Sequence, residues 1–176
     1  MKATQRLFFA LWPDAATSVA VAALARDVAE HARGRATLRE NIHLTLAFLG
    51  DQPSAIVPVL TEQMRAIEVS RFSLRLDQVG CWRRSGIAWL GAAEAPSELV
   101  SLHAELARIV GSLGIVVDDR PFAAHLTLAR RIATSVHRSL DPPIAWPVET
   151  LTLVVSEPGK ERPVYRVLES HPLARV

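Results

Sequence analysis

Residues 43–46 read HLTL, and residues 125–128 read HLTL again. The two copies lie about half of the 176-residue chain apart. At ordinary residue frequencies, a chance second copy is expected in roughly one of a few hundred chains of this length. A repeat at this spacing therefore indicates two related lobes.

Both copies lie in short apolar stretches that predict β-strands. Side chains in a strand alternate between its two faces, so His43 and Thr45 share one face, as do His125 and Thr127. The intervening leucines then point into the core. If the two strands are neighbours, one surface presents two imidazoles and two hydroxyls.

Two imidazoles on one surface suit the hydrolysis of a phosphodiester. A neutral imidazole takes a proton from the attacking water, and a protonated one gives a proton to the departing sugar oxygen. Histidine suits both roles because its unperturbed pKa is about 6.5. Threonine hydroxyls can donate to the non-bridging phosphate oxygens. We therefore predict that His43 and His125 are catalytic and that Thr45 and Thr127 bind the substrate.

Two other interpretations of these histidines are open. A lone strand histidine usually satisfies its hydrogen bonds inside a core, but the matched His-x-Thr pair favours a functional role. Neutral histidines also bind metals. A metal would need a third ligand, and no carboxylate lies at metal-motif spacing from either histidine. We expect no metal and no other cofactor.

Segments around both copies extend the pattern over most of the chain, at residues 6–11, 41–50, 89–91, 120–122 and 125–130. They resemble the two-histidine phosphoesterase superfamily. More closely, the sequence is similar to the bacterial and archaeal RNA 2′,3′-cyclic phosphodiesterases, also called 2′-5′ RNA ligases. One departure is Ala124, where relatives often have proline, and we expect it to affect strand entry rather than chemistry.

This resemblance implies a bilobal fold with the active site in a cleft between the lobes. It also implies metal-independent hydrolysis of a terminal RNA 2′,3′-cyclic phosphate to a 2′-phosphate. In such enzymes the first motif histidine is taken as the proton donor and the second as the acceptor. These roles fall on His43 and His125, and Thr45 and Thr127 would bind the phosphate.

Further candidates lie near the motifs or on aromatic stretches. Arg130 follows the second motif, and we predict that it binds a phosphate oxygen or the RNA backbone. Phe9 is predicted to stack on a base. Trp12, Trp82 and Tyr165 also fit stacking or cleft roles, but for each a place in the core or at a hairpin tip is an open alternative. His103 lies off the apolar stripe of its expected helix, and we expect it to be solvated.

The remaining pattern predicts an α+β fold, with helices covering one side of mainly antiparallel sheets. Together with the resemblance, this implies two such sheets lining a central cleft, with the helices on the outside. No linker is evident, so we expect a single domain, residues 1–176, of two pseudo-symmetric lobes. Helices are expected at residues 13–31, 54–67 and 97–113, and the proline-rich stretch 139–147 is expected to be a loop. Strands are expected at residues 7–12, 37–39, 42–49, 71–79, 87–90, 125–128, 150–155 and 164–168.

Composition narrows the class of protein. With 49% hydrophobic and 22% charged residues, the chain is typical of a globular protein. The single cysteine excludes an internal disulfide framework and a cysteine-rich metal site. The apolar start is too short for a signal peptide, and no stretch approaches a membrane span. No Walker phosphate loop supports ATP-driven ligation. We expect a cytoplasmic protein.

The repeat thus predicts a phosphodiesterase, and the resemblance implies that it acts on RNA ends bearing 2′,3′-cyclic phosphate, such as tRNA fragments. We expect a monomer without an obligatory protein partner. Reversible 2′-5′ ligation, or opening of another cyclic phosphate, is an open alternative because the same two histidines would catalyse it. A non-catalytic RNA-binding module is a further alternative, against which two complete HxTx motifs argue.

Overall fold

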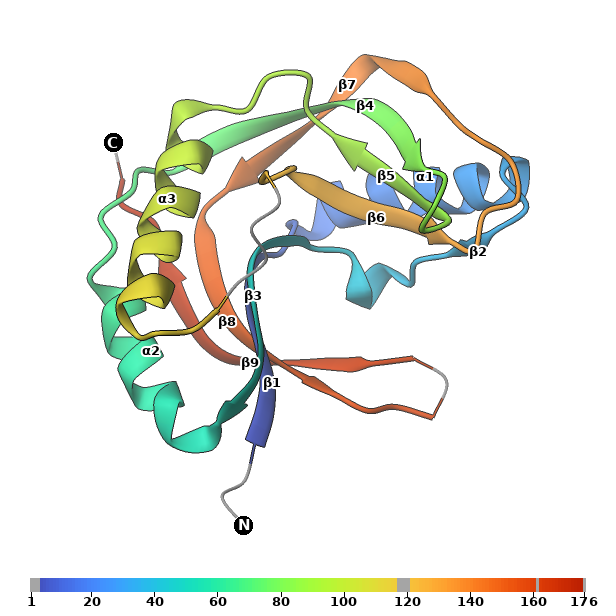
Figure 1. Cartoon of the computed structure of the whole chain (residues 1–176). Helices are drawn as coiled ribbons and strands as arrows, with labels where there is room; N and C mark the ends of the chain where they lie inside the picture. The colour runs from blue at the N-terminus through green and yellow to red at the C-terminus, as the bar shows by residue number, and fades with distance from the viewer. Residues whose placement is uncertain (1–3, 117–120, 161, 176) are drawn as a thin grey trace.

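The structure, a computed structural model, describes residues 4–116, 121–160 and 162–175. Within them, three α-helices cover a nine-stranded sheet (Figure 1). The helices are α1 (Ala15–His31), α2 (Val57–Arg65) and α3 (Ser97–Ser112). The strands are β1 (Thr4–Leu11), β2 (Arg35–Ala36), β3 (Leu44–Pro53), β4 (Phe72–Trp82), β5 (Ile87–Gly91), β6 (His125–Arg130), β7 (Arg138–Val148), β8 (Thr150–Glu157) and β9 (Val164–Pro172).

The strand order is symmetric about the centre of the sheet. It runs β7-β4-β5-β6-β3-β1-β8-β9, with β2 added beside β6, and every named pairing is antiparallel. The two halves of four strands meet where Leu44 of β3 pairs with Leu126 of β6. The predicted α+β class and antiparallel pairing are confirmed, and the two expected sheets are joined here into one.

Each half carries the same irregularity at the same motif position. In β3, Leu46 has no partner in β1, and in β6 the corresponding Leu128 has no partner in β5. Because a bulge is a specific local feature, its recurrence on both copies is the structural counterpart of the sequence repeat. The assignment of residues 1–176 to one domain stays a prediction.

Helices lie on the outer side of the curved sheet (Figure 1). Helix α1 begins at Ala15, two residues later than expected, because Asp14 caps it: the Asp14 carboxylate accepts from the backbone N–H groups of Ala16 and Thr17. Its buried face packs on β6, and α3 packs on β3. The main core fills the space between sheet and helices. None of the described helices is long and apolar enough to cross a membrane.

The largest departure from the sequence-based prediction is β7. The proline-rich stretch expected to be a loop forms most of this strand, which pairs only with β4 at one edge of the sheet. Pro142 and Pro143 lie between the paired residues Ser139 and Ile144, where the register shifts. Proline is tolerated there because an edge or bulge position does not require its missing N–H.

Smaller departures concern element ends. The expected strand 37–39 is instead the shorter β2, followed by a 3₁₀ turn over Arg39–Asn41. In place of the helix expected over residues 54–67, a 3₁₀ turn over Ser54–Ile56 precedes α2, which ends at Arg65. Strand β3 runs on through Pro53, beyond its expected end at residue 49.

Candidate active site

The pairing at the centre of the sheet brings the two motifs together. Leu44 and Leu126 are both fully buried in the main core, so the residues on either side of them point to the opposite face. The antiparallel register puts the first histidine opposite the second threonine, and the first threonine opposite the second histidine. Directly opposed residues in such a pair have Cβ atoms about 5 Å apart. All four side chains predicted from the repeat therefore gather on one surface.

Both histidine rings are held in the same way. Nδ1 of His43 lies 2.9 Å from the carbonyl oxygen of Asn41, and Nδ1 of His125 lies 2.7 Å from that of Ala123. A carbonyl oxygen only accepts, so each Nδ1 carries its hydrogen and donates it. The neutral ring then has its lone pair on Nε2. This leaves Nε2 of each imidazole as the atom that exchanges protons.

Thr45 completes the hydrogen bonding of the first ring. Its Oγ1 lies 3.1 Å from Nε2 of His43. With Nδ1 protonated, the threonine hydroxyl donates to the Nε2 lone pair. This hydroxyl is therefore already turned toward the reacting nitrogen and needs only to rotate to reach a phosphate oxygen.

Aromatic rings enclose His43. Trp12 stacks on its imidazole at 4.7 Å between centroids and 18° between planes. Tyr165 meets it edge-on at 5.1 Å, and Phe8 packs against it at 5.2 Å. Burial lowers the pKa of His43 from 6.5 to about 4, the Asn41 hydrogen bond opposes this, and the charges of Arg130 and His125 lower it further. His43 is thus neutral near pH 7 in the free protein.

His125 lies in a second, more open aromatic setting. Trp82 contacts its ring edge-on at 4.5 Å between centroids and remains 37% exposed. Trp89 lies beside Trp82, and its indole occupies the space that a Cβ on Gly80 would need. Burial lowers the pKa of His125, against the hydrogen bond to Ala123, and the charge of Arg130 lowers it as well.

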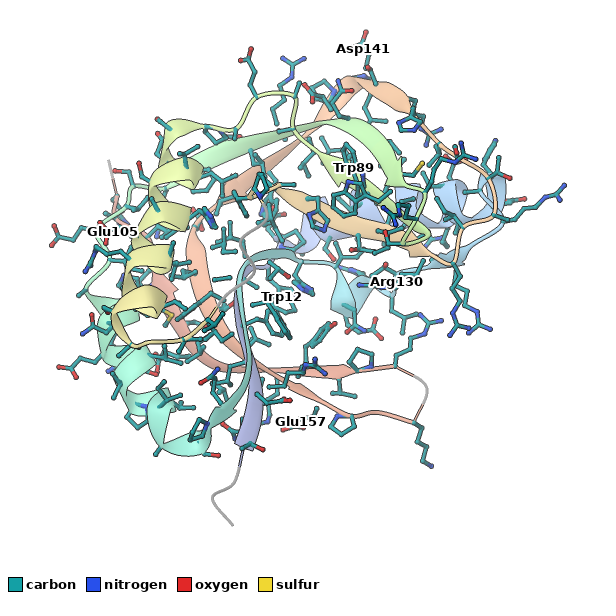
Figure 2. The ribbon with its side chains drawn as sticks, viewed as in Figure 1. Trp12, Trp89, Glu105, Arg130, Asp141 and Glu157 are labelled. Atoms are coloured by element: carbon teal, nitrogen blue, oxygen red, sulfur yellow. The ribbon has the colours of Figure 1, made fainter. Side chains whose placement is uncertain are left out.

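Arg130 reaches this face because of the bulge in β6. Simple alternation from His125 would turn Arg130 toward the core. The bulge instead buries both Leu128 and Ala129, and Arg130 pairs with Ile87 of β5 on the side of the threonine. Its positive charge lowers the pKa of both histidines, which indicates that it lies close to them. Figure 2 shows Arg130 between the end of β6 and the β8–β9 hairpin.

The prediction for Phe9 is wrong. Phe9 is fully buried in the main core and presents no face to a base. Phe8, the next residue toward the N-terminus, packs with Tyr165 and Trp12 in the second cluster beside His43. Strand alternation in β1 could have identified Phe8, because Phe8 and Trp12 lie on one face of the strand and Phe9 lies on the other.

Of the other candidates, three aromatic residues lie at the site, and one histidine differs from the expectation. Trp12, Trp82 and Tyr165 all line the site, each against one of the two histidines. His103 is not solvated as expected: its Nδ1 donates to the carbonyl of Leu46, and its ring stacks on Phe122 at 3.9 Å. Arg120, in one of the resembling segments, lies outside the described residues.

The arrangement supplies the parts of a phosphodiester hydrolase. The two imidazoles offer Nε2 atoms that exchange protons. The two threonines occupy the other two corners of the four-residue cluster, and the Arg130 guanidinium lies at its edge. Within the described part of the chain, no group of three or more His, Cys, Asp or Glu side chains is placed to hold a metal ion.

Comparisons with known proteins identify the family of this chain. A family model described as the 2′-5′ RNA ligase superfamily matches residues 12–160. RNA 2′,3′-cyclic phosphodiesterase of Escherichia coli is 31% identical over 172 residues, covering 96% of this chain and 97% of that protein. The enzyme of the same name from Thermus thermophilus is 35% identical over 146 residues, covering 75% and 72%. A crystal structure of E. coli LigT complexed with 3′-AMP has a TM-score of 0.89 at 30% identity, covering 97% of this chain and 99% of that one.

Proposed function

Because this chain belongs to the 2′-5′ RNA ligase superfamily, we propose that it is an RNA 2′,3′-cyclic phosphodiesterase that leaves a 2′-phosphate. The observation that carries the proposal is the pairing of Leu44 with Leu126, which places the two His-x-Thr motifs side by side on one face of the sheet. RNA ends with a cyclic phosphate, such as tRNA fragments, are its proposed substrates.

The reaction follows from the positions of the two Nε2 atoms. Water attacks phosphorus and loses a proton to the neutral imidazole, while the bond from phosphorus to the 3′-oxygen breaks. That oxygen takes the proton of the other imidazole, so the ring opens to a 2′-phosphomonoester and the two histidines exchange protonation states. The hydroxyls of Thr45 and Thr127 donate to the non-bridging oxygens, where charge builds up.

The bound substrate supplies the protonation that the free site lacks. Burial keeps the pKa of both histidines below 6.5 in the free protein, so both are neutral at pH 7. The cyclic phosphate carries one negative charge, and an opposite charge within a few ångströms favours the protonated imidazole. Substrate binding therefore draws one proton onto the pair. We propose His43 as the donor, following the family pattern, and His125 as the acceptor.

A substrate with sulfur in place of the 3′-oxygen tests these roles. A thiolate leaves without needing a proton, so the variant that lacks only the general acid regains activity on it. We expect His43→Ala to recover on the sulfur substrate and His125→Ala to remain slow. The opposite pattern would assign the acid to His125.

The function itself is tested by product analysis. A short RNA ending in 2′,3′-cyclic phosphate is incubated with the protein in the presence of a chelator. We expect a 2′-phosphate end. A 3′-phosphate product would mean that acid and base act on the wrong sides, and activity lost to the chelator would mean a metal reaction. Binding without ring opening would leave a non-catalytic RNA-binding module.

We further propose that the protein acts as a monomer in the cytoplasm. Both histidines and both threonines come from one chain, so the site needs no second copy. The single cysteine is in keeping with a reducing compartment. Ligation to a 2′-5′ bond would use the same two imidazoles in reverse, and water, as the more abundant nucleophile, favours hydrolysis.

A further inference from the structure

Two arginines stand side by side at one edge of the site. Arg35 of β2 is the direct cross-strand partner of Arg130 in β6, so both side chains project from the same face. Both are exposed. Within the described part of the chain, neither makes an ion pair with a carboxylate.

Among the cross-strand pairs of the described residues, no other sets two arginines opposite each other. Several other arginines form ion pairs with carboxylates, as in Arg65 with Glu169 at 3.0 Å and Arg166 with Glu157 at 2.8 Å. Like charges directly opposite each other in a sheet are destabilising. An anion between the two guanidinium groups would remove that cost, and the planar fork of arginine matches a phosphate.

The local backbone fixes Arg35 beside Arg130. The N–H of Thr37 donates to the carbonyl of Leu128 at 2.8 Å. At Gly34, a Cβ would come within 2.8 Å of the Ile132 side chain and 3.0 Å of the Arg130 carbonyl oxygen, so β2 packs closely against the end of β6. The two arginines cannot separate without breaking this contact.

A third guanidinium joins the pair from the other half of the sheet. Nη1 of Arg162, at the β8–β9 hairpin, donates to the carbonyl of Ala36 at 3.3 Å. Ala36 is the residue after Arg35. The hairpin thereby reaches β2, and three positive side chains converge at one end of the site.

We propose that Arg35 and Arg130, assisted by Arg162, bind the phosphodiester on the 5′ side of the terminal nucleotide. This inference rests on the proposed function. Thr127 pairs with Trp89 and Arg130 with Ile87, so with the bulge at Leu128 the two lie only two residue steps apart along the sheet, about 7 Å at the rise of a strand. That separation sets the arginines beyond the reacting phosphate, at the next phosphate of an RNA chain. The enzyme would thus prefer RNA ends over cyclic mononucleotides.

Three substrates isolate this contact. They are a 2′,3′-cyclic mononucleotide with a free 5′-hydroxyl, the same compound with a 5′-phosphate, and a dinucleotide ending in 2′,3′-cyclic phosphate. We expect Arg35→Gln to lower kcat/KM about tenfold on the second and third substrates relative to the first. Arg26→Gln, on the exposed side of α1, makes the same charge change and is the matched control.

Salt dependence gives an independent signature. Each phosphate contact to single-stranded nucleic acid adds about 0.7 to the slope of log affinity against log salt concentration. For the dinucleotide, we expect this slope to fall by about one such increment in Arg35→Gln and to stay unchanged in the Arg26→Gln control.

The outcomes separate the two proposals. Wild-type protein that opens none of the three rings would refute the proposed function. If the wild-type protein opens the rings but Arg35→Gln lowers kcat/KM equally on all three substrates, or on none, the phosphate subsite alone is refuted. A loss confined to the dinucleotide would assign the contact to the second nucleoside and would also overturn it.

Discussion

Protonation of His43 couples the active site to the stability of the fold. Its folded pKa of about 4 lies below the unfolded value near 6.5, because Trp12, Tyr165 and Phe8 exclude water from the ring. A depressed histidine pKa means that the unfolded state binds the proton first. The contribution of neutral His43 to the free energy of unfolding is therefore present above pH 6.5 and is lost as the pH falls toward 4.

The size of the effect follows from these two values. Between pH 8 and pH 5, His43 alone lowers the free energy of unfolding by about 2 kcal/mol, and by pH 4 by about 3 kcal/mol. His43→Gln removes this titration but keeps an amide N–H that can donate to the Asn41 carbonyl. His125 titrates in both proteins, so the difference between them isolates His43.

Urea unfolding, followed by circular dichroism at several pH values, measures this difference. We expect the variant to gain about 2 kcal/mol on the wild type as the pH is lowered from 8 to 5. NMR titration of His43 should give a midpoint near 4 in the free protein. Stability curves that stay parallel over this range would refute the argument, because the imidazole would then protonate as freely as in water.

Three further changes follow from the same contacts. Trp12→Leu uncovers one face of His43, so its pKa should rise toward 6.5 in an NMR titration, and an unchanged midpoint would mean that the stack does not desolvate the ring. Arg130→Gln removes a charge that lowers the pKa of both histidines, so the optimum of kcat/KM should move to higher pH; a shift to lower pH would contradict the placement of Arg130. Gly80→Ala puts a Cβ into the Trp89 indole and should cost about 1–3 kcal/mol in urea unfolding, whereas Gly111→Ala, with open space around its Cβ, should cost no stability.

The grouping of the four motif side chains on one face could be predicted from the sequence, because a local rule decides it. Alternation along a strand decides which side chains share a face, and an exact repeat marks two equivalent strands. The direct pairing of Leu44 with Leu126 follows from no local pattern. It is a long-range contact, which the repeat made plausible and the fold supplied.

The errors fall where one residue changes the register. Phe8, and not Phe9, shares a face of β1 with Trp12. Arg130 reaches the site face only because of the bulge at Leu128, and strand alternation alone would place it on the opposite face. The prolines near residue 142 indicated a loop, but they fit an edge strand with an irregular register. Trp12, Tyr165 and Trp82 could not be separated from core aromatics until the strands were assembled.

The proposed function depends most on the two imidazoles acting together, and single-turnover ring opening tests this directly. Wild-type protein, His43→Ala and His125→Ala are compared on one RNA ending in 2′,3′-cyclic phosphate, with RNA affinity measured in parallel. We expect each alanine variant to lose about 10²–10⁴-fold in rate with little change in affinity. An alanine variant that opens the ring at close to the wild-type rate would contradict the two-histidine mechanism.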